Sequence, residues 1–89
     1  MHTFPRGIIF TLMTTDQVKE LIEAGLPGAV IEVTDERATG DHFSAVIEWA
    51  GFEGLSLLEQ HQKVYAAVGE YLTREIHALQ LKTFTPDTT

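Results

Sequence analysis

The chain has 89 residues, no cysteine and a formal net charge of −7, with 13 acidic residues against 6 basic ones. This length is enough for one domain, and the missing cysteine excludes a disulfide framework, a thiol nucleophile and a metal site built on the chain's own thiolates. The acidic total argues against nucleic acid as a partner, because sequence-independent affinity for phosphate backbones comes from Lys and Arg. It favours a basic protein partner instead.

Residues 1–13 are expected to form a poorly ordered N-terminal extension. Their apolar run begins at Gly7 and is too short to span a membrane. It also lacks the small-residue cleavage pattern of a signal peptide. We therefore expect a cytoplasmic protein without a membrane anchor. Met13, followed by Thr-Thr-Asp, is a candidate for the biological start.

The first predicted element is a short helix over residues 16–24. Thr14 and Gln17 stand three apart just before an apolar-periodic stretch, which is the pattern of a capping box. Gly25 followed by Pro27 is the usual order at a helix C-terminus.

Two strands are predicted next, over residues 29–34 and 42–50. The first segment is rich in β-branched residues, and the second alternates apolar with polar side chains. The polar segment 35–41 between them carries a glycine near its end. Together the two strands should form an antiparallel hairpin with an exposed loop.

A second helix is predicted to begin at Ser56, which forms another capping box with Glu59. Gly69 is expected to kink or split this helix, because glycine inside a helix costs roughly 1 kcal/mol relative to alanine. Residues 77–84 alternate again and predict a last strand. The apolar face expected for the helix consists of Leu57, Leu58, His61, Val64, Tyr65, Val68 and Leu72.

The order of elements is therefore helix, strand, strand, one or two helices, strand. A strand reached through a helical crossover usually lies parallel to the one before it. We predict an α+β sandwich, with helices on one face of a three-stranded mixed sheet. The domain should span residues 14–86, with residues 87–89 as a tail.

The four histidines are the candidates for metal binding or titration near neutral pH, and His2, in the extension, is interpreted as incidental. His61 falls on the apolar face of the second helix, where a histidine is expected to pack in the core with its ring nitrogens hydrogen-bonded. His42 and His77 open two strands, and periodicity alone favours surface positions for both. Two histidines would leave a metal site half finished, because zinc or a [2Fe–2S] centre needs four ligands.

The remaining polar motifs have structural explanations. Ser44 lacks an obvious His–Asp partner, and Ser56 is accounted for by capping. The letters Gly-Phe-Glu-Gly at 51–54 match the GxxG of KH domains. However, this segment lies between a predicted strand and a predicted helix and has acidic neighbours. We interpret it as a turn that leads into the helix.

Three motifs together resemble the BolA family over residues 14–86. They are Phe-x-Gly-x-Ser at 52–56, His61 followed by Val-Tyr at 64–65, and the ending Ile-His-Ala-Leu to Thr-Pro at 76–86. The family fold is similar to a class II KH domain with the order αββααβ, which agrees with the order predicted above.

The resemblance implies that a monothiol glutaredoxin is the partner and that the two proteins share a bridging [2Fe–2S] cluster. The family's cluster histidine lies in Ile-His-Ala-Leu, so this role carries onto His77. Many members have a second ligand in the hairpin loop, which His42 matches. A glutaredoxin cysteine and the thiol of glutathione would complete the four ligands, and two histidines alone should hold metal weakly. Lys82, Phe84 and Pro86 are predicted partner contacts.

The sequence departs from the family where many members have Arg-His-Arg and this chain has Gln-His-Gln at 60–62. We expect a non-enzymatic adaptor for iron–sulfur trafficking or iron and redox regulation, and a monomer or weak homodimer when it is alone. One alternative is a nucleic-acid-binding transcriptional regulator, and another is an interaction module without a cofactor. The regulator would need a basic stripe formed by Lys19, Arg37, Lys63, Arg74 and Lys82.

Overall fold

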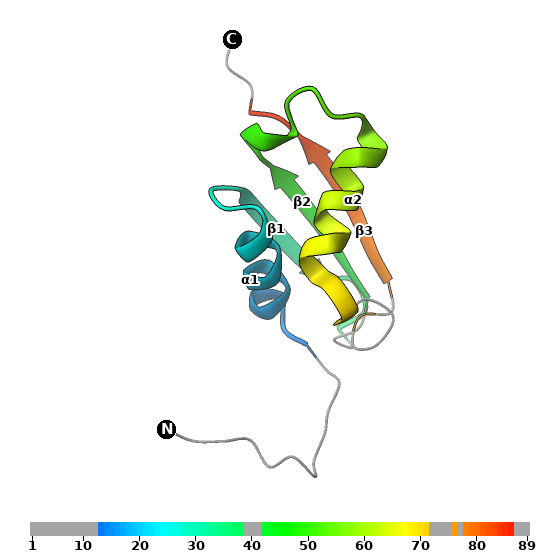
Figure 1. Cartoon of the computed structure of the whole chain (residues 1–89). Coiled ribbons are helices and arrows are strands. Elements are labelled where there is room, and N and C mark those ends of the chain that lie inside the picture. Colours follow the sequence, from blue (N-terminus) through cyan, green and yellow to red (C-terminus); the bar gives the residue numbers. More distant parts are fainter. Residues whose placement is uncertain (1–12, 39–41, 72–75, 77, 87–89) are drawn as a thin grey trace.

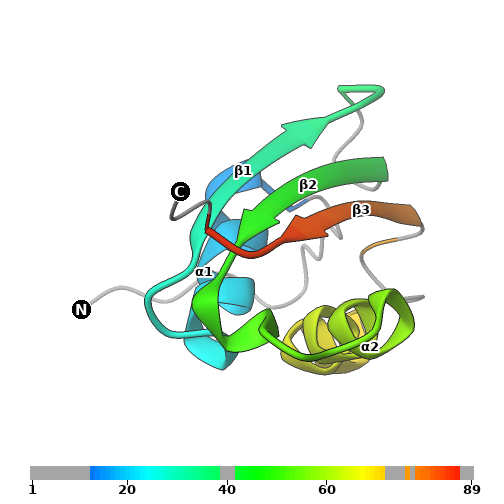
Figure 2. The same ribbon diagram turned by 90° about the horizontal axis from the view of Figure 1, so that it is seen from above.

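The computed structural model describes residues 13–38, 42–71, 76 and 78–86. Two α-helices lie on one side of a three-stranded sheet, as Figures 1 and 2 show in perpendicular views. The predicted α+β class is confirmed. In chain order the elements are α1 (Thr15–Gly25), β1 (Val30–Asp35), β2 (His42–Glu48), the 3₁₀ turn η1 (Ala50–Phe52), α2 (Leu57–Val68), the 3₁₀ turn η2 (Gly69–Tyr71) and β3 (Ala78–Phe84).

Both α-helices begin at the capping boxes that the sequence predicts. At α1, the Gln17 N–H donates to the Thr14 hydroxyl at 3.0 Å, and the Gln17 side chain accepts from the Thr14 N–H at 2.9 Å. Ser56 and Glu59 repeat this reciprocal pair at α2, at 3.1 and 2.9 Å. Each box satisfies two N–H groups that a helix start would otherwise leave without partners.

Gly69 ends α2 rather than kinking it. Its backbone has φ +66° and ψ −139°, a conformation that side chains with a Cβ strongly disfavour. The 3₁₀ turn Gly69–Tyr71 follows directly, where the family order αββααβ has a further helix. Residues 72–75, which include Leu72 of the predicted apolar face, lie outside the described residues.

The sheet is mixed, as predicted, with the order β1-β2-β3. β1 pairs antiparallel with β2, and β2 pairs parallel with β3. Burial alternates along all three strands, so alternate side chains face the helices and the others face outward. We call the outward side the open face. Three rows of directly paired residues cross it: Val30–Glu48–Phe84, Glu32–Val46–Lys82 and Thr34–Ser44–Gln80.

The core lies between the sheet and the helices, and its largest fully buried side chains include Phe43, Phe52 and Ile76. Only part of the apolar face predicted for α2 takes part in it. Val64 and Val68 are buried, whereas Leu57 and Leu58 are 61% and 67% exposed. The prediction for these two leucines was wrong, because α2 packs mainly against α1 and only one side of its apolar stripe meets the core. Met13, assigned to the extension, packs against the core.

The two ends of the sheet differ in construction. At the end that we call the tryptophan end, the Trp49 indole N–H donates to the Pro27 carbonyl at 2.9 Å, and the Trp49 backbone N–H donates to the Phe84 carbonyl at 3.1 Å. The Trp49 ring also meets the buried Phe52 ring edge-on, with centroids 5.3 Å apart. We call the opposite end, where β2 and β3 begin at His42 and Ala78, the histidine end.

Candidate metal centre

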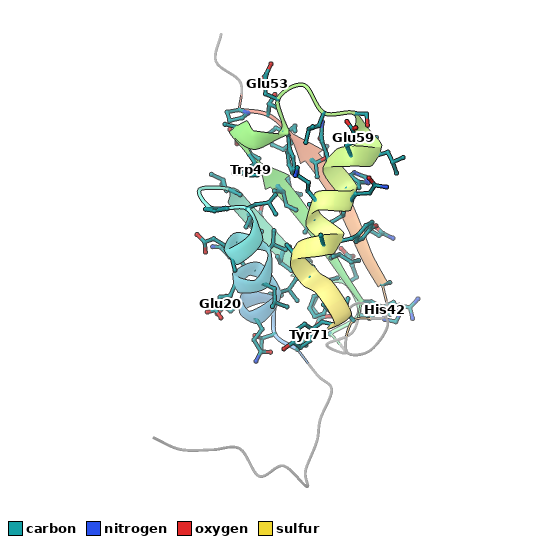
Figure 3. The ribbon with its side chains drawn as sticks, in the orientation of Figure 1. Glu20, His42, Trp49, Glu53, Glu59 and Tyr71 are labelled. Atoms are coloured by element: carbon teal, nitrogen blue, oxygen red, sulfur yellow. The ribbon has the colours of Figure 1, made fainter. Side chains whose placement is uncertain are left out.

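His42 opens β2 at the end of the hairpin, as the sequence predicts. The Glu36 N–H donates to the His42 carbonyl at 2.8 Å and so extends the β1–β2 ladder by one pair. The side chain of His42 is half-buried, and Figure 3 shows it at the lower end of the molecule. An imidazole at such a position keeps part of its surface accessible to a partner.

β2 and β3 are paired so that His42 lies directly opposite Ala78. His77, the predicted principal ligand, lies outside the described residues, but the chain bonds it directly to Ala78 and to Ile76. Ile76 is fully buried, and its N–H donates to the Tyr71 carbonyl at 2.8 Å. Both residues that flank His77 in the chain are therefore held, and one of them is the strand partner of His42.

Taken alone, the described residues do not make a complete metal site. They contain no group of three or more His, Asp or Glu side chains placed to hold one ion. A [2Fe–2S] centre needs four ligands, and imidazole can replace thiolate at one of its two irons, as in Rieske centres. A pair of imidazoles would supply one half of such a centre, and the other half would have to come from thiols that this chain lacks.

The three predicted partner contacts do not lie near His42. Lys82 is exposed on the open face, Phe84 is 41% exposed at the tryptophan end, and Pro86 is half-buried just beyond it. Phe84 lies six positions along the strand from Ala78, which corresponds to about 20 Å. The structure thus places Phe84 and Pro86 at the opposite end of the sheet from His42.

His61 differs from its expected role as a hydrogen-bonded core histidine. It is half-buried on α2, and its Nε2 atom is shielded from solvent yet has no hydrogen-bond partner among the described residues. The prediction was wrong because α2 turns this side of its apolar stripe towards the rim of the sheet. Next to it along the same stripe, Tyr65 donates its hydroxyl to the carbonyl of Leu79 at 3.4 Å.

Gln60 has a structural role that the sequence did not reveal. Its amide N–H donates to the Leu55 carbonyl at 3.0 Å, and its amide oxygen accepts from the Thr83 hydroxyl at 2.6 Å. It therefore ties the start of α2 to β3. Gln62, the other glutamine of the Gln-His-Gln segment, is exposed. No local pattern could have separated the two, because Leu55 and Thr83 come together only in the folded chain.

The GxxG segment is a turn, as interpreted from the sequence. Phe52 is fully buried in the core, and Gly54 has φ +81°. Gly51 lies against the Trp49 ring, where an added Cβ would come within 2.5 Å of ring atoms. Both glycines are thus explained by packing and backbone geometry, and a phenylalanine held in the core prevents this segment from opening as a clamp.

Ser44 and Ser56 both make structural hydrogen bonds. The Ser44 hydroxyl donates to a carboxylate oxygen of Glu36, and Ser56 caps α2. A hollow of about 380 Å³ lies along α2 and is lined by Leu55, Glu59, Gln62, Lys63 and Ala66, away from His42. Among the described residues, no helix combines the length and apolar character that crossing a bilayer would require.

Comparison with known proteins agrees with this fold and with the motifs in it. A family model described as BolA-like protein matches residues 23–88. The uncharacterized protein RP812 of Rickettsia prowazekii is 32% identical over 71 residues, which are 80% of this chain and 92% of RP812. The DNA-binding transcriptional regulator BolA of Escherichia coli K12 is 28% identical over 81 residues, with 83% and 77% of the two chains covered.

A solved structure, that of a bolA protein homologue from Coxiella burnetii, superimposes with a TM-score of 0.75 at 40% sequence identity. The match covers 85% of this chain and 95% of the Coxiella chain. At this identity and coverage, the two chains share the fold over most of their length.

Proposed function

The chain belongs to the BolA family, and from that premise we propose that it is a non-enzymatic adaptor for iron–sulfur trafficking or for iron and redox regulation. In this role it binds a monothiol glutaredoxin and shares a bridging [2Fe–2S] cluster with it. The observation that carries the proposal is the pairing of His42 with Ala78. This pairing joins the hairpin to the residue bonded to His77 and so supports the proposal that two imidazoles act at one end of the sheet.

The chain's part in this function is to present nitrogen ligands from a folded support. His77 is the principal ligand and His42 the second, while a glutaredoxin cysteine and the thiol of glutathione complete the set. Histidine in place of thiolate raises the reduction potential of a [2Fe–2S] centre. The cluster of the mixed complex should therefore be reduced more easily than one held by glutaredoxin and glutathione thiolates alone.

The proposal is tested by reconstituting the complex from this chain, a monothiol glutaredoxin, iron, sulfide and glutathione under anaerobic conditions. Visible absorption and circular dichroism report the cluster, and size-exclusion chromatography with light scattering reports the complex. Wild type is compared with His77→Ala and His42→Ala. His61→Ala is the matched control, because it removes a third imidazole that sits on α2 rather than at the histidine end.

We expect His77→Ala to abolish the spectrum of the mixed cluster and His42→Ala to weaken or alter it, with His61→Ala unchanged. If His77→Ala retains both the wild-type spectrum and the wild-type complex, the proposal is wrong. If His42→Ala alone behaves like wild type, His77 remains the ligand and another group must supply the second position.

The rival function is regulation through nucleic acid, which the name of the Escherichia coli relative favours. The positions of the Lys and Arg side chains among the described residues argue against nucleic-acid binding. Lys19 lies on α1, Arg37 follows β1 and Lys63 lies on α2, while Lys82 projects from the open face of β3. Arg74 lies outside the described residues. Lys63 and Lys82 belong to opposite layers of the molecule, so these charges do not form one stripe of the kind that follows a phosphate backbone.

A further inference from the structure

The open face of the sheet carries a pattern of side chains that is complementary to itself. Among the described residues nothing packs on this face, because both helices lie on the other side (Figure 2). One row reads Glu32–Val46–Lys82 and so places opposite charges on either side of an apolar residue. The neighbouring row has Val30 and Phe84 at its ends, 66% and 41% exposed.

We propose that the open face is the contact between two copies of this chain, stacked sheet against sheet about a two-fold axis that runs along β2. This operation places β1 of one copy over β3 of the other. Each Glu32 then faces the partner's Lys82, and each Val46 faces its own counterpart. In the next row, Val30 of each copy meets the partner's Phe84. The interface then contains two ion pairs, because Glu32 of each copy meets Lys82 of the other. It also contains three apolar contacts: one between the two copies of Val46 and two between Val30 and Phe84.

The charges also exclude the other face-to-face two-fold arrangement. An axis across the strands, through the row of Val46, would set Glu32 on Glu32 and Lys82 on Lys82. Like charges placed opposite each other oppose association, whereas complementary charges fix the orientation of partners. Only the axis along β2 pairs each charge with its opposite. The orientation therefore follows from the order of the strands and the pairing of their residues.

The contact should be weak. Three strands spaced by about 4.8 Å and seven residues long give a footprint of roughly 300 Å² per copy, well below the ~800 Å² per partner of a stable interface. Glu48 lies on the axis and meets its own counterpart, which also opposes association. We expect a dimer that forms reversibly at high protein concentration. This contact is argued from the charge and apolar rows alone and does not depend on the proposed cluster.

A charge-swap experiment tests the proposal on the full chain. Sedimentation velocity is measured from about 10 μM to about 1 mM, the range in which weak contacts associate, at 0.15 M salt. Glu32→Lys alone and Lys82→Glu alone should each raise the dissociation constant by about tenfold or more. Mixed in equal amounts, the two variants should associate again, because each charge then meets its opposite in the other chain.

Two controls address the change in net charge. Glu20→Lys makes the same charge change as Glu32→Lys on an exposed position of α1, in the other layer (Figure 3), and should dimerise no less than wild type. Glu48→Gln should strengthen the dimer more than Glu20→Gln does, because only Glu48 meets its counterpart across the axis. Both comparisons separate the proposed contact from general repulsion between acidic chains.

The proposal is overturned if wild type stays monomeric up to 1 mM, or if the mixed variants associate no better than each variant alone. It is also overturned if Glu32→Lys and Lys82→Glu leave self-association unchanged but weaken binding to glutaredoxin, because the open face would then belong to that partner. A glutaredoxin complex that forms normally with the swapped variants would leave the proposed function intact whatever the oligomer.

Discussion

The two ends of the sheet differ in how their residues are held. At the tryptophan end, Trp49 is fixed by two hydrogen bonds and by the ring of Phe52, which is fully buried. At the histidine end, His42 is half-buried, and the nearby Ser44–Glu36 bond is exposed. The difference teaches that the side chain of His42 adds little to the core, although its neighbour Phe43 and the nearby Ile76 are fully buried. Substitution of His42 should therefore change binding without unfolding the domain.

The largest effect is expected for Phe52→Ala at the tryptophan end. Removing a fully buried phenylalanine costs about 3–5 kcal/mol, a large part of the 5–15 kcal/mol typical of a whole domain, and it also removes the edge contact with Trp49. Urea unfolding followed by circular dichroism measures it. Phe84→Ala is the matched control, because this ring is 41% exposed, and it should cost about 1 kcal/mol or less. Both rings lie at the tryptophan end, so similar losses for both variants would mean that the burial of Phe52 does not set the loss.

The contact between the two helices gives the next largest effect. A Cβ added at Gly25 would lie 2.5 Å from the Cβ of Ala67, so Gly25→Ala should destabilise by about 1–3 kcal/mol through overpacking. This outweighs the gain of up to ~1 kcal/mol that alanine brings to a helix. The second variant, Gly25→Ala with Ala67→Gly, exchanges the two side chains and should recover most of the loss. A double variant no more stable than Gly25→Ala would refute the contact.

Much of the fold could be predicted because its determinants are local. The capping boxes at Thr14 and Ser56 bond over three residues, and the hairpin joins strands that are neighbours in the chain. The burial of α2 was predicted less well. Apolar residues three and four positions apart predict a stripe that includes Leu57 and Leu58. Which part of that stripe meets the core depends on how the helix packs against α1.

For the candidate site, too, local features could be predicted from the sequence, whereas the pairing of distant strands could not. His42 could be chosen from its place at the start of a strand and from the family motif. The alignment of His42 with Ala78 could not be derived, because a long crossover separates β2 from β3 and no local pattern sets their register. Nor could the distance from His42 to Lys82, Phe84 or Pro86 be derived, because it follows from the same register along an extended strand.

An effect of intermediate size is expected for Gln60, which links α2 to β3. Gln60→Ala removes two hydrogen bonds, to the Leu55 carbonyl and to the Thr83 hydroxyl, and should lower the free energy of unfolding by about 1–2 kcal/mol. Gln62→Ala, two positions along the same helix on an exposed site, should change it by no more than about 0.5 kcal/mol. Equal effects would show that Gln60 does not tie α2 to β3. Chemical denaturation of both variants at one protein concentration is sufficient.

The smallest effect is expected at the histidine end, and Ser44→Ala measures it. Its hydroxyl bonds Glu36 on an exposed surface, where water can replace the lost partner, so the free energy of unfolding should change by no more than about 0.5 kcal/mol. The matched variant Ser56→Ala removes the cap of α2 and should cost about 1 kcal/mol, because the freed N–H groups at a helix start are harder to satisfy. A larger loss at Ser44 than at Ser56 would reverse the comparison, since the exposed bond at the histidine end would then stabilise the fold more than the helix cap does.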